Sequence, residues 1–312
     1  MKDEGRRTGM KLFSSFAFAL CFLVMGCFGC GGDEEQKQQQ VTTTIQRQRI
    51  VIGRIPSGNV IDIAEKMDPL KQLLEQKLDV EVAVRFTTDY KEFTGKMERQ
   101  EYDMAFCAPF QYIAAHEKAG YEAVLRPIRH GADTYVGLLI TAKSEITSIE
   151  QLRGKRIAFV DQGSSSGYLF PLGLLAANGI SLTDIQPFFL KGHDNVVLNV
   201  LSRSYDAGAC YEGAEKTYGK ARAGEIKIIA ETDPIYNEPI AISPKFRKDN
   251  PELAEKIVRV MTELHQTPEG AAAIAKYGEG VSRFVAATDA DYNSVRLYRE
   301  KLPAEVIASS GL

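Results

Sequence analysis

Cysteine and histidine are scarce in this 312-residue chain, and its basic residues do not cluster. Only two of the five cysteines, Cys107 and Cys210, lie beyond residue 30, and they are far apart in sequence, so they do not suggest a structural zinc site. With a net charge of −3 and no basic stretch, the chain lacks the charge pattern of a nucleic-acid-binding protein. The composition therefore predicts no metal, no cofactor and no nucleic-acid partner.

The N-terminal residues have the pattern of an export signal. Basic residues precede an apolar run over residues 12–25, which is too short to span a bilayer comfortably, and a small residue and a cysteine follow it. The motif Val-Met-Gly-Cys that ends at Cys27 resembles a bacterial lipobox, in which the cysteine becomes the lipidated first residue of the mature protein. We expect a lipoprotein signal peptide over residues 1–26 and lipid attachment at Cys27, with Cys30 as the weaker candidate.

Residues 27–48 are polar and lack apolar periodicity, which is typical of a disordered tether. The roughly 265 residues that follow are enough for two lobes of ordinary size. We therefore expect a lipidated, flexible tether over residues 27–48. It would hold a folded, monomeric body outside the cytoplasmic membrane, in the periplasm or on the outer face of the cell membrane.

From residue 49 onward, short β-branched runs alternate with longer amphipathic stretches. Strand–helix alternation of this kind builds a sheet with parallel strands and helices on its faces. The first series predicts strands over 50–55, 80–86 and 102–107 and helices over 60–78 and 89–98. The second predicts strands over 156–161, 187–190, 206–210 and 226–231, with helices after the serine run, around 195–201 and over 213–223. Beyond residue 250 we expect only helices, over 251–264, 268–276 and 289–302.

Two extended stretches, 134–141 and 239–242, separate these series. The simplest arrangement is an α/β fold of two α/β lobes joined by two crossing extended hinge segments, with a helical tail that returns to the first lobe. Lobe 1 would comprise residues 49–136 plus 240–312, and lobe 2 residues 137–239. In sheets of this kind ligands bind beyond the carboxyl ends of the strands and between lobes.

The run Gly-Ser-Ser-Ser-Gly over residues 163–167 satisfies the G-x-S-x-G pattern of serine hydrolases. That reaction needs a general base and an acid, in the order Ser, Asp or Glu, His. Of the four histidines, His193 follows too closely to leave room for the acid, and His265 lies within a predicted helix. No His-Gly-Gly-Gly element is present. An exported serine hydrolase is therefore a remote alternative.

The same run also has the pattern of a helix N-terminus that holds an anion. Ser164 can cap the helix, Ser165 and Ser166 add hydroxyl donors, and Gly167 lets the backbone come close. The first amides of a helix lack intrahelical partners and carry a partial positive charge. Together these donors match a tetrahedral oxyanion. A serine-rich cap without a ligand is the other interpretation, although a cap needs only one serine.

The segment over residues 155–171, which includes the serine run, resembles the signature of the phosphate/phosphite/phosphonate-binding proteins of ABC importers. The resemblance covers nearly all of residues 49–302, with further matching segments at 68–70, 88–90, 103–112, 192–194 and 206–210. It implies a type II periplasmic-binding-protein fold that closes like a hinge on its ligand. It also implies binding without catalysis and an ABC permease as the membrane partner. A ligand sensor for a membrane signalling partner is the alternative from another class.

The resemblance assigns roles to individual residues. The three serines would hold the oxygens of a phosphonate, phosphite or phosphate, with His193 donating from the same lobe. Tyr90 and Tyr112 would face them from the other lobe. In the family's aminoalkylphosphonate binders, acids pair with the ligand ammonium, and the nearest positions are Glu212 and Glu238, although both could be solvated rim residues.

Cys107 and Cys210 end predicted strands at the expected cleft, one in each lobe. A disulfide between them would lock the hinge, so we expect free thiols.

Overall fold

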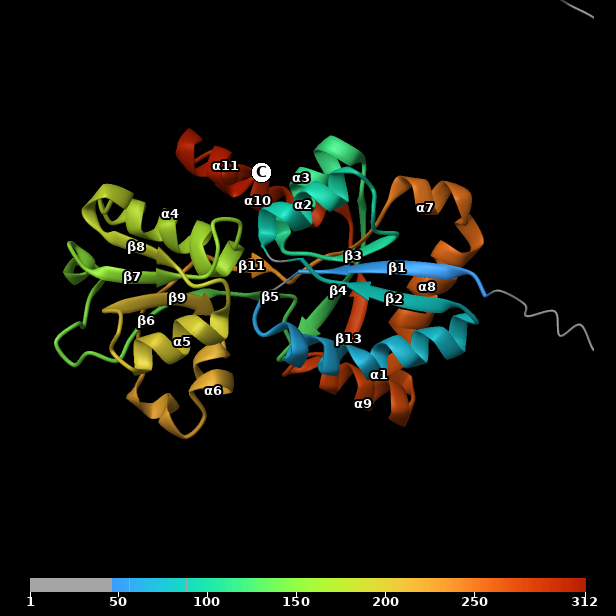
Figure 1. The fold of residues 1–312 in the computed structure, drawn as a ribbon, viewed down its shortest axis with the longest axis horizontal. Coiled ribbons are helices and arrows are strands. Elements are labelled where there is room, and N and C mark those ends of the chain that lie inside the picture. The colour runs from blue at the N-terminus through green and yellow to red at the C-terminus, as the bar shows by residue number, and fades with distance from the viewer. Residues whose placement is uncertain (1–46, 56, 88) are drawn as a thin grey trace, which may run out of the picture. The chain divides into compact units, whose positions relative to one another are not determined.

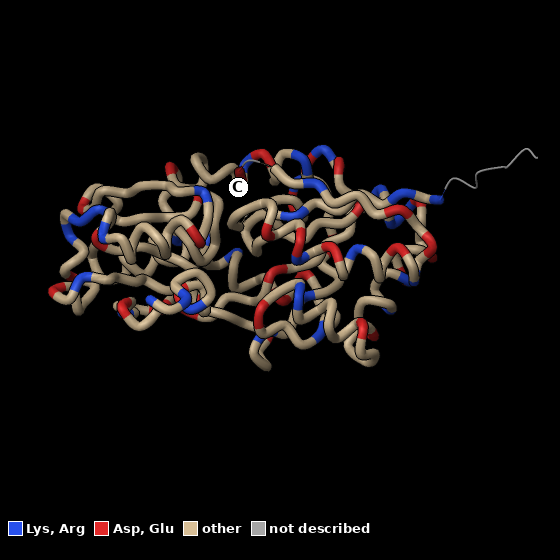
Figure 2. Tube along the Cα trace, turned by 60° about the horizontal axis from the view of Figure 1, so that its bottom comes forward, with Lys and Arg blue, Asp and Glu red and all other residues tan. Residues whose placement is uncertain are grey.

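The computed structural model describes residues 47–55, 57–87 and 89–312 (Figure 1). The expected signal peptide, Cys27, Cys30 and all but the last two residues of the expected tether lie outside the described residues. Within these ranges, no helix is both long and apolar enough to cross a membrane. Figure 2 shows basic and acidic residues interspersed along the described trace.

A six-stranded mixed sheet forms the first lobe, in the order β13-β4-β12-β3-β1-β2. Strands β1, β2 and β3 run parallel, whereas β12 is antiparallel to both of its neighbours. The strands are β1 (Arg49–Arg54), β2 (Glu81–Arg85), β3 (Met104–Phe106), β4 (Glu122–Arg129), β12 (Ile240–Ile242) and β13 (Val281–Ala286).

Helices cover both faces of this sheet, with α1 and α9 below it and α2 and α3 above it in Figure 1. Helix α1 occupies the predicted range because Asn59 caps its first amides and its buried residues recur on one face. The helices are α1 (Val60–Leu78), α2 (Tyr90–Glu98), α3 (Pro109–Ala119), α7 (Pro244–Asp249), α8 (Pro251–Glu263), α9 (Pro268–Tyr277), α10 (Asn293–Arg299) and α11 (Ala304–Ser310).

A five-stranded sheet in the order β10-β6-β9-β7-β8 forms the second lobe. Its centre is parallel, since β7 pairs in parallel with both β8 and β9, and β6 and β10 add antiparallel strands at one side. The elements are β6 (Gly137–Thr141), β7 (Arg156–Phe159), β8 (Gln186–Phe189), β9 (Ala207–Tyr211), β10 (Lys227–Glu231), α4 (Phe170–Ala177), α5 (His193–Leu201) and α6 (Ala214–Gly219).

The chain passes between the two lobes twice, and the two crossing segments pair with each other. Strand β5 (Thr134–Tyr135) leads into lobe 2, and β11 (Ile235–Tyr236) leads back. They form a short antiparallel ladder in which Tyr135 lies opposite Ile235. The predicted arrangement of two α/β lobes with two extended crossings is thus confirmed. Residues at or just after the carboxyl ends of β1, β3, β7 and β9 line one cavity.

The expectation that only helices follow residue 250 is wrong, because β13 completes the first sheet beside β4. A bulge between Val281 and Arg283 breaks the alternation of apolar and polar residues that identifies a strand. Strand β4 was not predicted either. It contains Pro127, which is unusual inside a sheet, but Pro127 lies beyond the part of β4 that pairs with β12.

Candidate functional site

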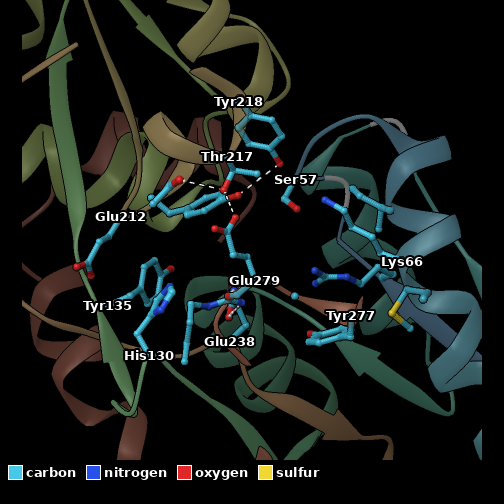
Figure 3. A pocket seen from close by; sticks show the side chains of 17 residues that line it. Ser57, Lys66, His130, Tyr135, Glu212, Thr217, Tyr218, Glu238, Tyr277 and Glu279 are labelled. Carbon is cyan, nitrogen blue, oxygen red and sulfur yellow. Dashed lines mark hydrogen bonds and ion pairs between the residues drawn. The ribbon is translucent and has the colours of Figure 1, made fainter. Parts of the chain in front are cut away.

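Two adjoining cavities lie where the strand ends of the two sheets meet. We call the smaller, of about 40 Å³, the head compartment, and the larger, of about 90 Å³, the outer compartment (Figure 3). Both are lined by Arg54, Ser57, Tyr135, Tyr211 and Glu238. The head compartment is further lined by Ile55, Tyr90, Ala108, Ser164, Ser165, Ser166 and His193. Most of the residues that the sequence singled out are therefore brought together.

Asp161 shapes the serine loop that follows β7. One carboxylate oxygen accepts the N–H of Gly163 at 3.0 Å, and the backbone oxygen accepts the N–H of Ser164 at 2.9 Å. The other carboxylate oxygen pairs with Lys191 at 2.9 Å. The chain then makes a π-helical turn over Ser165–Leu169 that continues into α4. Turns of this type are frequent at functional sites.

The three serines are 1, 1 and 4 % exposed, and each is engaged differently. Ser164 Oγ accepts the N–H of Gly167 at 3.1 Å as an N-cap. Ser166 lines the head compartment together with Tyr135 of the first crossing strand. Ser165 Oγ is buried and has no hydrogen-bond partner within the described ranges. Because an unpartnered buried polar group costs about 1–3 kcal/mol, Ser165 is the donor most clearly available to a ligand.

His193 lines the head compartment as a neutral donor. It is the first residue of α5 and is buried. Its Nδ1 accepts the backbone N–H of Tyr211 at 3.3 Å, so the ring proton lies on Nε2. Burial lowers the pKa of His193 to about 3. The imidazole is therefore neutral at physiological pH and offers an N–H without a charge.

Tyrosine hydroxyls come from three different elements. Tyr90 begins α2, Tyr135 lies in the first crossing strand, and Tyr211 ends β9. Burial raises the pKa of all three, so they remain protonated. Tyr90 and Ser164, which come from opposite lobes, both line the head compartment. Neutral hydroxyls, one imidazole and the amides of a helix start form a donor set that suits an oxyanion.

Arg54 is the cation of the head compartment, and it is absent from the sequence prediction. It ends β1, and its Nε and Nη1 are buried without a hydrogen-bond partner in the part of the chain that the structure describes. Its guanidinium lies 5.5 Å from the ring centroid of Tyr277, within cation–π range. A charged residue at the carboxyl end of an otherwise apolar strand was the signal that could have found it.

The two predicted acids differ in burial and in partner. Glu238 lines both compartments and lies 3.7 Å from Nη2 of Arg129, with side chains 25 and 17 % exposed. Burial opposes the charge of Arg129, but Glu238 and nearby tyrosines outweigh it and raise the pKa of Arg129. Glu212 is exposed and lines only the outer compartment, where Figure 3 shows its carboxylate turned away from the centre.

Tyr112 does not line either compartment, contrary to the sequence prediction. It lies on the inward face of α3, where its hydroxyl donates to Asp289 at 2.9 Å and its ring packs on Tyr292. Gly167 lies behind the serines, also outside the lining. A Cβ there would come within 2.4 Å of Val160 Cγ2, so this glycine allows the loop to pack closely on the strand.

Hydrogen bonds between the lobes surround the serine loop. Gln111 Nε2 donates to the backbone oxygen of Gly163 at 2.9 Å. On the other side, Tyr298 from the helical tail donates to the backbone oxygen of Phe170 at 2.7 Å, and their rings stack at 4.0 Å. These contacts bring lobe 1 against the part of lobe 2 that carries the serines.

The site lacks the relay of a serine hydrolase. In a Ser-His-Asp triad a carboxylate accepts from Nδ1 of the histidine, whereas Nδ1 of His193 accepts a backbone N–H. Cys107 and Cys210 are buried and carry free thiols. In the described ranges, no group of three or more His, Cys, Asp and Glu side chains is arranged to hold a metal ion.

Comparison with known proteins identifies the family of this chain. A family model described as the periplasmic substrate-binding protein of the phosphonate ABC transporter matches residues 52–292. The chain is 28% identical over 274 residues to the phosphate-import protein PhnD of Mycolicibacterium smegmatis, covering 80% of this chain and 84% of that one. It is 25% identical over 279 residues to the phosphonates-binding periplasmic protein of Escherichia coli, covering 86% and 78%.

Solved structures share the fold at lower sequence identity. The binding protein of an ABC phosphonate transporter from Pseudomonas aeruginosa aligns with a TM-score of 0.73 and 19% identity, covering 85% of this chain and 93% of that one. PhnD1 of Prochlorococcus marinus in complex with methylphosphonate aligns with a TM-score of 0.73 and 17% identity, covering 81% and 98%. The predicted type II periplasmic-binding-protein fold is confirmed.

Proposed function

The chain belongs to the family of periplasmic substrate-binding proteins of phosphonate ABC transporters, and we propose that it captures a phosphonate, phosphite or phosphate in the head compartment for delivery to an ABC permease. The observation that carries this proposal is Ser165 Oγ, a buried hydroxyl at the start of a helical turn that has no hydrogen-bond partner among the described residues. An oxyanion oxygen at this position would accept its hydrogen bond.

The donor set explains how an anion could be held and released. Hydroxyls of the serine loop and Tyr90, together with Nε2–H of His193, would make charge-assisted hydrogen bonds to the ligand oxygens. The first amides of the serine turn would add their partial positive charge. Because this set is made of neutral groups, it can bind a dianion without forming a fixed ion pair at the serines. The ligand would stabilise the form in which Tyr90 and the serine loop meet.

The proposal includes an anchor at the outer face of a membrane. Family membership places the protein outside the cytoplasm. The lipobox-like motif supports lipid attachment at Cys27, with residues 27–48 as the tether and a monomeric body. If so, Cys27→Ala moves the protein from the membrane fraction to the soluble fraction, whereas Cys30→Ala leaves it membrane-bound. The reverse result would assign the anchor to Cys30.

A thermal-shift series tests ligand binding. Phosphate, phosphite, methylphosphonate and 2-aminoethylphosphonate are compared, with sulfate as the control. A ligand at a hundred times its Kd adds about 2.7 kcal/mol to the free energy of unfolding, which raises Tm on the order of 5 °C. We expect such a shift with at least one phosphorus oxyanion and none with sulfate. Equal Tm values in all five solutions would contradict the proposal.

A further inference from the structure

Arg54 is a half-buried cation whose Nε and Nη1 atoms are buried. Its Nε and Nη1 have no hydrogen-bond partner, and none of the ion pairs among the described residues includes it. A buried guanidinium without hydrogen bonds or a negative partner is unfavourable. Since Arg54 lines both compartments, a ligand at their junction can supply the missing acceptors and the missing charge.

The buried charges around Arg54 do not cancel. Arg129 Nη2 and Glu238 Oε2 form an ion pair at 3.7 Å, and this oxygen has no hydrogen-bond partner among the described residues. The remaining acids of the outer compartment, Glu212 and Glu279, are exposed, so water and salt screen them. Lys66, which also lines the outer compartment, is half-buried and adds a further positive charge. Of the two ionised side chains that line both compartments, Glu238 is in an ion pair, whereas Arg54 is in none among the described residues.

We propose that Arg54 determines ligand specificity by charge: it compensates negative charge on the ligand and excludes an ammonium group. The site would then take phosphorus oxyanions whose substituent is absent, uncharged or anionic. This inference rests on the proposed function. It differs from the assignment of Glu212 and Glu238 as partners of a ligand ammonium, because Glu238 is paired with Arg129 and Glu212 is exposed.

Calorimetric titration of the full chain at pH 7.5 and fixed ionic strength tests the inference. The ligands are methylphosphonate, phosphonoacetate and 2-aminoethylphosphonate, which differ in the charge of the substituent. The unmodified protein should bind methylphosphonate at least about tenfold more tightly than 2-aminoethylphosphonate, because bringing like charges together is strongly unfavourable. Phosphonoacetate, with its carboxylate, should bind at least as tightly as methylphosphonate.

Variants identify the residue responsible. Arg54→Gln should weaken the binding of methylphosphonate and reduce the ratio of its affinity to that of 2-aminoethylphosphonate to about threefold or less. Arg54→Lys, which keeps the charge, should retain most of the advantage. Lys248→Gln, which removes an exposed charge from α7 outside both compartments, should leave the ratio unchanged, because water and salt screen this ammonium. The melting temperature of each unliganded variant is measured alongside.

Two results would overturn the inference while leaving the proposed function in place. One is tighter or equal binding of 2-aminoethylphosphonate by the unmodified protein. The other is an equal loss of affinity for all three ligands in both Arg54→Gln and Arg54→Lys. That result would mean that Arg54 acts by packing and not by its charge. Should Arg54→Gln fail to fold, the preference of the unmodified protein and of Arg54→Lys still decides. Failure of the unmodified protein to bind any phosphorus oxyanion would instead contradict the proposed function.

Discussion

The two faces of the head compartment are built from different chemistry. Lobe 2 contributes neutral donors: three serines at a helix start, and His193, whose burial keeps it uncharged. Lobe 1 contributes Tyr90 and Arg54, a cation that is in no ion pair among the described residues and whose Nε and Nη1 have no hydrogen-bond partner there. The difference separates two tasks. Oriented neutral donors suit the oxygens that all the candidate ligands share, whereas a charge can distinguish ligands by their substituents.

Removing one donor from the neutral face should have the largest effect on affinity. Ser165→Ala deletes a hydroxyl that has no other partner, and a hydrogen bond to a charged group contributes about 1.5–3 kcal/mol. We expect methylphosphonate binding to weaken by roughly 10- to 150-fold with little change in the unliganded Tm. Calorimetry measures this. The control is Ser144→Ala, an exposed serine of the same lobe. Unchanged affinity in Ser165→Ala would mean that the neutral face does not contact the ligand.

A methyl group placed between the two faces should have the next largest effect. At Gly163 a Cβ would lie 2.8 Å from Gln111 Nε2 and 2.8 Å from Tyr90 Cβ, both in lobe 1. Overpacking of this kind costs about 1–3 kcal/mol, with relief if the Gln111 side chain moves. Gly163→Ala should therefore weaken the binding of every ligand by about the same factor. Gly224→Ala, which adds a methyl group in open space, serves as the control. An affinity equal to that of the control would show that the faces need not meet so closely.

The neutrality of lobe 2 predicts a pH effect on stability. His193 has a pKa of about 3 in the folded protein and about 6.5 when unfolded, so the unfolded chain binds more protons between these values. Its contribution to stability is therefore complete above pH 6.5 and is lost as the pH falls toward 3. The limiting slope is about 1.4 kcal/mol per pH unit. Urea unfolding is measured from pH 4.5 to 7.5. As the pH falls, the free energy of unfolding should decrease more steeply for the unmodified protein than for His193→Gln. Parallel curves would mean that the pKa of His193 is about the same in the folded and the unfolded protein.

The contact between the helical tail and lobe 2 should have the smallest effect. Tyr298→Phe removes the hydrogen bond to the backbone oxygen of Phe170 but keeps the stacked rings. One neutral hydrogen bond contributes about 0.5–1.5 kcal/mol, so affinity should fall by roughly 2- to 13-fold. Tyr205→Phe, whose ring packs on Phe188 within lobe 2, is the control. A tighter-binding Tyr298→Phe would contradict a role of this contact in holding the lobes together.

The neutral face was largely predictable because it is local in sequence. A strand, a loop and a capped helix follow one another over residues 156–177, so the pattern alone places Ser164 at the cap with Ser165 and Ser166 beside it. The same holds for α1, whose capping residue and apolar spacing lie within one segment. The π-helical turn over Ser165–Leu169, in contrast, was not predicted, because it depends on how the serine loop packs against β7.

The charged face was not predictable in the same way, because it is assembled from distant segments. Arg54 has a role only because β1 ends opposite the serine loop. The nearby ion pair between Arg129 and Glu238 likewise joins residues that are far apart in sequence. Tyr112 was misplaced because a residue soon after a strand can point either to the cavity or into the core. The helical turn that starts at Pro109 directs it to Asp289. β13 was missed because a bulge disrupts its pattern.

The most direct test of the serine cradle is a calorimetric titration of methylphosphonate into the unmodified protein and into the Ser165→Ala/Ser166→Ala double variant. Ser164 is kept because it caps the helix, so the double variant should retain its fold. We predict one-to-one binding by the unmodified protein and a loss of well over tenfold in the variant, with closely similar melting temperatures in the absence of ligand. Equally tight binding by the folded double variant would contradict the account.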